Sequence, residues 1–191
     1  MLYPVAKFIL RSLYRLLFRL EAAGVENVPS SGPLILASNH VSNFDPPTVG
    51  ILIERKVHFM AKIELFKVPV LGPIIRRLGA FPVNRGGVSK DAIKAAIALL
   101  EEGKTMAIFP EGSRNSGGAG KKGMALIAHR SGALIVPVAI TGGYKLFGKT
   151  KVSYGQPIDP KAIIDPHSED PLGQITEAVM TRIRELAEGR Q

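Results

Sequence analysis

The sequence predicts an α/β fold, a single layered domain in which helices flank a largely parallel central sheet. Short β-like runs alternate with helical runs after Gly24, and Gly, Pro and Asp stand at their boundaries. Several of the β-like runs are continuous apolar stretches, which is typical of strands covered on both faces. The chain has 191 residues, of which 46% are hydrophobic and 21% charged, enough for one core of ordinary domain size.

The expected elements follow from these patterns. Strands are expected at residues 34–37, 57–60, 80–83, 105–109, 134–140 and 152–154, and helices at residues 46–53, 70–78, 89–101, 122–131 and 171–188. In parallel sheets, functional side chains usually lie in the loops just beyond the carboxyl ends of the strands. Three loops with polar side chains qualify, at residues 38–47, 84–85 and 110–114.

The start of the chain contains its most amphipathic stretch, a predicted helix over residues 4–20. Lys7, Arg11, Arg15 and Arg19 recur every four residues and form one stripe, while apolar side chains cover most of the remaining surface. A spanning helix is not expected, because each central cation opposes insertion by about 2.5–3.5 kcal/mol. The pattern indicates a helix that lies in a membrane interface; a helix packed on the domain, with solvated cations, is the alternative.

The net charge of +9, from 25 Lys and Arg against 16 Asp and Glu, favours an anionic partner: anionic lipid, a phosphorylated substrate, an acidic carrier protein or nucleic acid. With no Trp, four Tyr and eight Phe, the chain lacks the interleaved basic and aromatic pattern of proteins that stack on bases, so nucleic acid is not expected. The absence of cysteine excludes a disulfide scaffold, a cysteine zinc site and a thiol nucleophile.

Two common motifs are also missing. Gly120-Lys121 is not part of a P-loop, because Asn115 stands in place of the first glycine and Lys122 in place of Ser or Thr. No G-x-S-x-G elbow occurs, so the usual serine-esterase arrangement is not expected. Chemistry without a serine or cysteine nucleophile favours direct attack by an acceptor within a ternary complex.

His40 and Asp45 form a His-x4-Asp pattern in the first of the three loops. A neutral imidazole can accept the proton that an attacking hydroxyl must lose, and a carboxylate on its other ring nitrogen fixes the tautomer and stabilises the imidazolium. Asp45-Pro46-Pro47 also has the pattern of a helix start with Asp45 as the N-cap. The alternative is therefore that Asp45 only caps a helix and His40 only fills a loop.

The segment Asn39-His40-Val41-Ser42-Asn43-Phe44-Asp45 resembles the first motif of the glycerophospholipid acyltransferases. Residues 79–85, 109–114 and 135–140 resemble that family's second, third and fourth motifs, in the same order, and the resemblance spans residues 25–160. It implies an acyltransferase domain over residues 25–191 with His40 and Asp45 as the catalytic pair, and the membrane-surface helix that the amphipathic pattern indicates would precede it at residues 1–24.

The same resemblance implies a set of substrate-binding residues, which are Lys62, Arg85, Glu111, Gly112, Ser113 and Arg114. Arg85 and Arg114 would hold the acceptor phosphate with their planar guanidinium groups. Glu111 would hydrogen-bond the glycerol portion, or would pair with Arg114. Lys62 would lie near the acyl or phosphate groups, or would be a solvated residue after a strand.

The reaction implied by the resemblance is transfer of a fatty acyl group from acyl-CoA or acyl carrier protein to the sn-2 hydroxyl of 1-acylglycerol-3-phosphate, giving phosphatidic acid in phospholipid biosynthesis. No metal is expected, and no cofactor beyond the thioester cosubstrate. The protein would bind an anionic membrane surface and attach, as a peripheral or monotopic protein, to the cytoplasmic face of the cell membrane. The alternatives are another acceptor, such as glycerol 3-phosphate or another lysophospholipid, and a non-catalytic module that binds anionic lipid.

Overall fold

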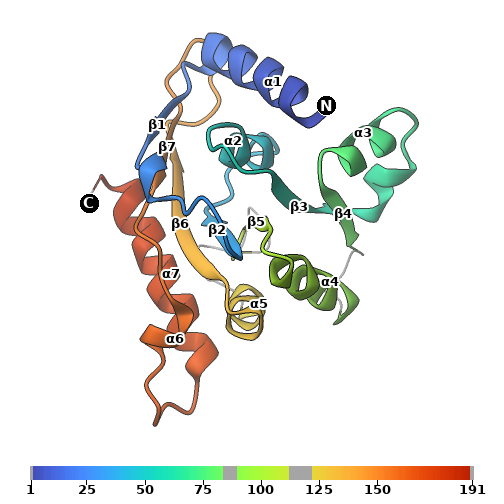
Figure 1. Ribbon diagram of the computed structural model, residues 1–191. Helices are drawn as coiled ribbons and strands as arrows, with labels where there is room; N and C mark the ends of the chain where they lie inside the picture. Colours follow the sequence, from blue (N-terminus) through green and yellow to red (C-terminus); the bar gives the residue numbers. More distant parts are fainter. Residues whose placement is uncertain (1, 84–89, 112–121, 190–191) are drawn as a thin grey trace.

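The computed structural model of the protein describes residues 2–83, 90–111 and 122–189 (Figure 1). Its centre is a seven-stranded sheet in the order β1-β7-β6-β2-β5-β3-β4. Neighbouring strands are parallel, except that β6 and β7 are antiparallel. The strands are β1 Glu21–Ala23, β2 Leu34–Ser38, β3 Val57–Lys62, β4 Ala80–Val83, β5 Thr105–Ile108, β6 Leu134–Thr141 and β7 Lys151–Tyr154. The predicted α/β class, with a largely parallel sheet, is confirmed.

Helices cover both faces of the sheet (Figure 1). They are α1 Leu2–Phe18, α2 Asp45–Ile51, α3 Leu71–Arg77, α4 Lys90–Glu101, α5 Gly123–Ser131, α6 Pro160–Ile163 and α7 Pro171–Ala187, with the short 3₁₀ helices η1 Val25–Asn27 and η2 Ile63–Lys67. Every strand and helix that the sequence predicts is present, with ends that differ by one or two residues. The short α6, η1 and η2 were not expected, because runs of three to five residues leave no periodic pattern.

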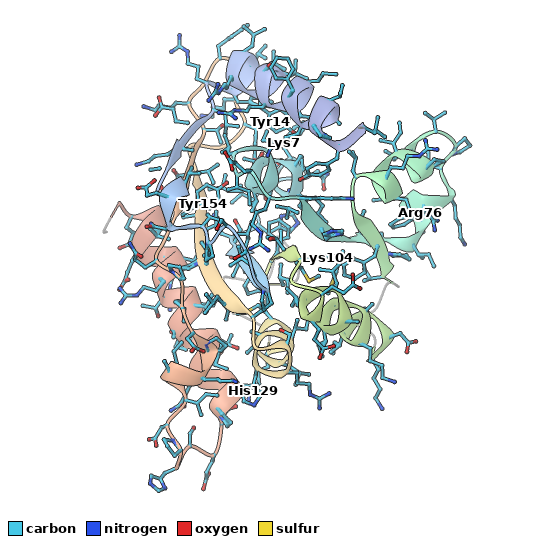
Figure 2. The ribbon with its side chains drawn as sticks, in the orientation of Figure 1. Lys7, Tyr14, Arg76, Lys104, His129 and Tyr154 are labelled. Atoms are coloured by element: carbon cyan, nitrogen blue, oxygen red, sulfur yellow. The ribbon has the colours of Figure 1, made fainter. Side chains whose placement is uncertain are left out.

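The core lies on both sides of β2. Leu34 and Leu36 join a buried cluster with residues of α1 and α2, whereas Ile35 and Ala37 join a second cluster with residues of α4, α5 and α7. All four side chains are 0% exposed. Burial on both faces explains why this strand reads as a continuous apolar run instead of an alternating one. On the first side, Tyr14 of α1 lies over α2 and is buried there (Figure 2).

β1 is a strand that the sequence does not reveal. Residues 21–23 read Glu-Ala-Ala, which has low strand propensity, yet they pair in parallel with residues 151–153 of β7. Gly24 follows at φ +71°, and a Cβ atom there would lie 2.1 Å from the carbonyl oxygen of Tyr154. The sequence predicts an N-terminal helical segment over residues 1–24. In the structure, residues 21–23 of that segment form an edge strand of the sheet. They do so because β7 offers them hydrogen-bonding partners.

The carboxyl ends of β2, β5, β3 and β4 lie at one edge of the sheet. Leu36 of β2 is level with Ala107 of β5, and Ala107 is level with Phe59 of β3. The loop that follows β2, the residues that follow Ile108 and the end of β3 therefore meet at this edge. It is the place where an α/β sheet usually carries its functional side chains.

Candidate active site

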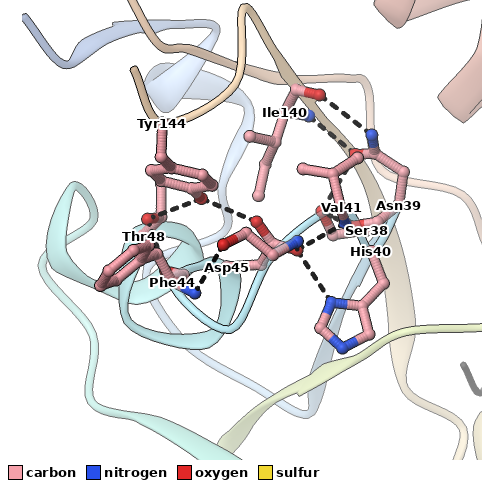
Figure 3. Close-up of polar contacts among 10 residues, drawn as sticks. Ser38, Asn39, His40, Val41, Phe44, Asp45, Thr48, Ile140 and Tyr144 are labelled. Atoms are coloured by element: carbon pink, nitrogen blue, oxygen red, sulfur yellow. Dashed lines mark hydrogen bonds and ion pairs between the residues drawn. The ribbon is translucent and has the colours of Figure 1, made fainter. Parts of the chain in front are cut away.

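His40 and Asp45 are in direct contact at the carboxyl edge of the sheet. Nδ1 of His40 lies 2.8 Å from Oδ2 of Asp45 (Figure 3). The His40 side chain is 19% exposed and the Asp45 side chain 0%. The loop after β2 carries the imidazole, and the first turn of α2 carries the carboxylate. The structure thus brings together two residues that would lie on different faces of a continuous helix.

Both oxygens of the Asp45 carboxylate accept hydrogen bonds. Besides His40, Oδ2 accepts from the backbone N–H groups of Val41 and Ser42, each at 2.6 Å. Oδ1 accepts from the hydroxyl of Tyr144 at 2.7 Å. Because an ionised carboxylate only accepts hydrogen bonds, four donors around it hold it in one orientation and compensate for its burial.

Asp45 does not cap α2, contrary to one reading of the sequence. The N-cap residue is Phe44, and Asp45 is already helical. If Asp45 were the N-cap, its side chain would bond the N–H of the second or third helical residue, and the second, Pro47, has no N–H group. The third would be Thr48, whose N–H donates to the carbonyl of Phe44 and not to the Asp45 side chain. The carboxylate is thereby left to the loop and to the imidazole.

Two other aspartates show the contrast. Asp159 and Asp170 also precede a proline at a helix start, and each accepts a hydrogen bond from a backbone N–H of its own helix, from Lys161 and Gly173 respectively. Asp45 differs from both: its carboxylate turns away from its own helix and contacts a histidine.

The hydrogen bond to Asp45 assigns the tautomer of His40. Since Oδ2 is an acceptor, Nδ1 carries the proton and Nε2 keeps its lone pair. The ring of Phe109 stacks on the imidazole, with ring centroids 4.4 Å apart and planes 26° apart. The imidazole is therefore fixed at one nitrogen and along one face, and Nε2 is the atom able to accept a proton.

The loop that carries His40 is tied to the neighbouring strand β6. The side-chain amide of Asn39 donates to the carbonyl of Ile140 at 2.9 Å and accepts from the N–H of Ile140 at 2.8 Å (Figure 3). The first and fourth sequence motifs thus meet through two hydrogen bonds. Val136 and Val138, from the fourth motif, are fully buried in the core.

Two of the substrate-binding residues that the resemblance implies, Glu111 and Lys62, lie among the described residues. Glu111 is half-buried, and burial raises the pKa of its carboxyl. His40 lowers this pKa and Asp45 raises it, so Glu111 lies within electrostatic range of both. Lys62 is the exposed last residue of β3, two strand positions from β2, or about 10 Å. The remaining four residues, Arg85, Gly112, Ser113 and Arg114, lie outside the described residues.

Comparison with known proteins shows which family the chain belongs to. The sequence profile described as Acyltransferase matches residues 19–141. The chain belongs to the acyltransferase family. It is 36% identical over 168 residues to the 1-acyl-sn-glycerol-3-phosphate acyltransferase of Bacillus subtilis, a match that covers 84% of each protein. The resemblance that the four motifs indicated is thereby confirmed.

Two further relatives of this acyltransferase agree. The 1-acyl-sn-glycerol-3-phosphate acyltransferase of Streptococcus pneumoniae is 34% identical over 161 residues, which are 81% of this chain and 60% of that protein. The crystal structure of the 1-acyl-sn-glycerophosphate acyltransferase of Thermotoga maritima superposes with a TM-score of 0.75 at 31% identity, over 97% of this chain and 79% of that one.

Tyr144 is a site residue of this acyltransferase that the sequence analysis missed. It lies three residues beyond β6, in the segment that leads to β7, and outside all four motifs. Its hydroxyl lies 3.0 Å from Oγ of Thr48 as well as 2.7 Å from Asp45. A signal was available, because β6 neighbours β2 in parallel and the residues after its carboxyl end must lie beside the His40 loop.

Four aromatic rings connect this site to α1. Tyr144 packs on Phe18 and Phe44 with ring centroids 5.4 Å apart in each case, and Tyr14 packs on both of these phenylalanines. Burial raises the pKa of Tyr14 to about 12, with a further contribution from Asp45. Burial also raises the pKa of Tyr144, so its phenol keeps the proton that it donates to Asp45. α1 is thus packed directly against the groups that hold the carboxylate.

The described part of this acyltransferase contains neither a membrane-spanning helix nor a metal-binding cluster. Over the described ranges, no helix combines the length and the apolar character needed to cross a bilayer. Within the same ranges, no three His, Asp or Glu side chains gather where they could hold a metal ion. That the reaction needs no metal and no further cofactor stays a prediction.

Proposed function

We propose that this acyltransferase transfers a fatty acyl group from a thioester to the sn-2 hydroxyl of 1-acylglycerol-3-phosphate, which forms phosphatidic acid. The observation that carries the proposal is the contact of His40 with buried Asp45, which leaves Nε2 of the imidazole as a base. The acceptor is supported by the names of the relatives from Bacillus subtilis and Thermotoga maritima, which the chain matches over most of their length.

The chemistry follows from the orientation of the imidazole. The acceptor hydroxyl donates its proton to Nε2 of His40 while its oxygen attacks the carbonyl carbon of the thioester. The resulting imidazolium is stabilised by the Asp45 carboxylate on Nδ1. When the tetrahedral intermediate collapses, the C–S bond breaks, and the departing thiolate takes the proton from Nε2. The imidazole is then neutral again, and the products are an ester and a free thiol.

The proposed substrate contacts come from the second and third motifs and from Lys62. His40 and Asp45 both influence the pKa of Glu111, so this carboxyl lies near the catalytic pair. That position supports a contact between Glu111 and the glycerol hydroxyls beside the base. Arg85 and Arg114 are proposed to hold the phosphate, and Gly112 and Ser113 to complete the third motif. Lys62, two strands from His40, is proposed to meet the more distant phosphate or acyl group of a substrate that extends along the edge.

Attachment to a membrane is supported by the two sides of α1. Tyr14 and Phe18 are buried against the core, while Phe8 is 71% exposed and Leu16 is 69% exposed. The helix therefore packs on the domain with one side and presents apolar side chains with the other. An anionic leaflet would suit both these side chains and the net charge of +9. The proposed location is the cytoplasmic face of the cell membrane, where acyl-CoA or acyl carrier protein would be the donor.

The test combines thiol release with product analysis by mass spectrometry. Purified protein is given 1-acylglycerol-3-phosphate and either acyl-CoA or acyl carrier protein thioester. We expect phosphatidic acid from the intact protein and a loss of about 10²–10⁴-fold in His40→Ala. His129→Ala is the matched control, because His129 is an exposed histidine on α5. Near-normal turnover by folded His40→Ala would refute the assigned base.

A panel of acceptors separates the alternatives. Preference for glycerol 3-phosphate or for another lysophospholipid would keep the chemistry and change the acceptor. Binding to anionic vesicles without any release of thiol would identify a non-catalytic lipid-binding module instead.

A further inference from the structure

A second exposed apolar surface lies on η2, α3 and the turn between them, apart from α1. We call it the η2–α3 surface and define it by Leu65, Val68, Val70, Leu71 and Ile74, which are 40%, 43%, 73%, 38% and 39% exposed. These five side chains fall within ten consecutive residues. Single exposed apolar residues are common, whereas a cluster of this kind indicates a contact surface.

Val70 is held outwards by an unusual turn. Its backbone has φ 67° and ψ −53°, and the N–H of Leu71 donates to the carbonyl of Pro69 at 2.7 Å. This is a γ-turn with positive φ, which is rare and strained, and a β-branched residue is among the least suited to it. The strain is not offset by burial, since Val70 is the most exposed large apolar residue of the described chain. Strained conformations that persist at the surface point to a function.

Close packing of η2 and α3 holds these side chains side by side. The N–H of Gly72 donates to the carbonyl of Val68, and a Cβ atom at Gly72 would lie 2.3 Å from the carbonyl oxygen of Phe66. The glycine is thus required for α3 to approach η2 so closely. Because the two short helices pack on each other, their apolar side chains form one surface.

Basic side chains border this surface. Lys67 lies at the end of η2, and Arg76 and Arg77 lie at the end of α3, all three of them exposed. The guanidinium of Arg76 stands over the ring of Phe66, 5.3 Å from its centroid, and extends from the rim of the molecule (Figure 2). Cations beside exposed apolar groups match the headgroups and acyl chains of an anionic bilayer. An acidic protein would match the cations alone.

The position of the η2–α3 surface relative to α1 also favours a bilayer as the partner. An apolar groove of about 60 Å³ lies beside α1. It is lined by Tyr3, Ala6, Lys7 and Leu10 of α1, by Pro47, Gly50 and Ile51 of α2, and by Phe59 and Leu78. Leu78 directly follows α3, so the groove lies between α1 and the end of α3. The end of α3 is therefore a neighbour of α1, which is the arrangement that a second contact with the same partner requires.

We propose that the η2–α3 surface is a second contact with an anionic phospholipid bilayer, so that the protein rests on the membrane at α1 and at η2–α3 together. Two contacts fix an orientation that one helix leaves free to rotate. η2 begins directly after Lys62, at the carboxyl edge of the sheet, so this orientation places the edge that carries His40 close to the lipid surface. The inference rests on the membrane attachment in the proposed function and adds a defined second site to it.

The test uses the absence of tryptophan from the chain, since each single substitution then introduces one fluorescent reporter. Val70→Trp reports on the η2–α3 surface and Phe8→Trp on α1. His129→Trp is the control on α5, which lies away from both in Figure 2. The probe is a vesicle of phosphatidylcholine and phosphatidylglycerol, with and without brominated acyl chains, and acyl transfer by each variant is assayed in detergent.

We expect the emission of Val70→Trp and of Phe8→Trp to move to shorter wavelength and to be quenched by the brominated lipid, while His129→Trp does not change. A shift for Phe8→Trp alone would overturn the inference and leave the proposed function intact. If neither reporter shifts while phosphatidic acid still forms, both membrane contacts are wrong and the acyl transfer stands. A shift of Val70→Trp only after addition of acyl carrier protein would assign the surface to a protein partner and overturn the inference.

A charge-reversal pair tests the basic border. Arg76→Glu with Arg77→Glu should weaken binding to the same vesicles by at least about tenfold, because each cation near an anionic surface contributes on the order of 1 kcal/mol. Arg130→Glu with Lys161→Glu changes the net charge equally at exposed positions on α5 and α6. Equal weakening by the two pairs would show that overall charge, and not this surface, governs the binding.

Discussion

The hydroxyl of Tyr144 donates a hydrogen bond of 2.7 Å to Oδ1 of Asp45, while Oδ2 of the same carboxylate faces His40. The two residues are 99 positions apart in the sequence, with Asp45 in the first turn of α2 and Tyr144 in the segment after β6. The carboxylate that orients the imidazole is thus itself oriented from its other side. Groups that hold a catalytic side chain in this way commonly affect the rate without touching the substrate.

Tyr144→Phe should lower kcat by about tenfold and leave KM for the acceptor nearly unchanged, because a buried oxygen of Asp45 loses its donor at a cost of about 1–3 kcal/mol. Steady-state kinetics with varied acceptor concentration measures both quantities. Tyr14→Phe is the matched control, since it removes a phenolic oxygen from the same aromatic cluster. Equal losses in the two variants would show that packing of the cluster, and not the hydrogen bond, is what matters.

Asp45→Asn should lower kcat by about 10²–10⁴-fold while the protein stays folded, because an amide cannot stabilise the imidazolium and can turn the imidazole to the wrong tautomer. Turnover and circular dichroism measure the two parts of this expectation. Asp170→Asn makes the same change at another Asp-Pro helix start, where the aspartate is an exposed N-cap, and should leave kcat unchanged. A folded Asp45→Asn variant with normal kcat would remove Asp45 from the mechanism.

Asn39→Asp should reduce both stability and activity. The acceptor for the N–H of Ile140 is kept, but the donor is replaced by an oxygen that faces the carbonyl oxygen of Ile140. We expect a loss of about 1–3 kcal/mol in urea denaturation, together with lower kcat, as the His40 loop separates from β6. Asn43→Asp adds the same charge at an exposed position of the same loop, so it should have little effect. A similar loss there would attribute the result to charge alone.

Tyr154→Phe should change how stability depends on alkaline pH. Burial raises the pKa of Tyr154 above its ordinary value of 10.0, so the folded protein holds this proton more tightly than the unfolded chain does. The resulting stabilisation is complete below pH 10.0 and is lost as the pH rises through the folded-state pKa. At neutral pH the variant should be less stable by about 1 kcal/mol, because the carbonyl of Val49 loses its donor at 2.8 Å, and this deficit should shrink above pH 10.0.

Urea unfolding at neutral pH and above pH 10.0 measures this change in the deficit. Ile175→Val is the control, because it removes a buried methyl group at a cost of about 1 kcal/mol and keeps every tyrosine. Its deficit should stay constant with pH. A constant deficit in Tyr154→Phe as well would show that Tyr154 does not contribute to alkaline unfolding.

Local sequence patterns were sufficient to predict most of the fold. The apolar runs at β2 and β6 predict buried central strands, because side chains on both faces must avoid water. β1 was missed for the converse reason: Glu-Ala-Ala has little strand preference of its own, and only the neighbouring β7 makes it a strand. Its discovery needed the pairing, which no window of the sequence contains.

In the candidate site, too, some features follow from local sequence and others from tertiary contacts. The sequence by itself determined the α/β class, the His40–Asp45 pattern and the family, because these depend on residue types at short spacing along the chain. Only the tertiary structure decided that Asp45 turns from its helix towards His40, that Asn39 is tied to Ile140 and that Tyr144 completes the carboxylate's contacts. The physical reason is that the bonds of Asn39 and Tyr144 join the segment after β2 to β6 and to the segment after β6, which sheet pairing and not sequence distance makes neighbours. The turn of Asp45 towards His40 depends in part on the Tyr144 bond that holds its other oxygen.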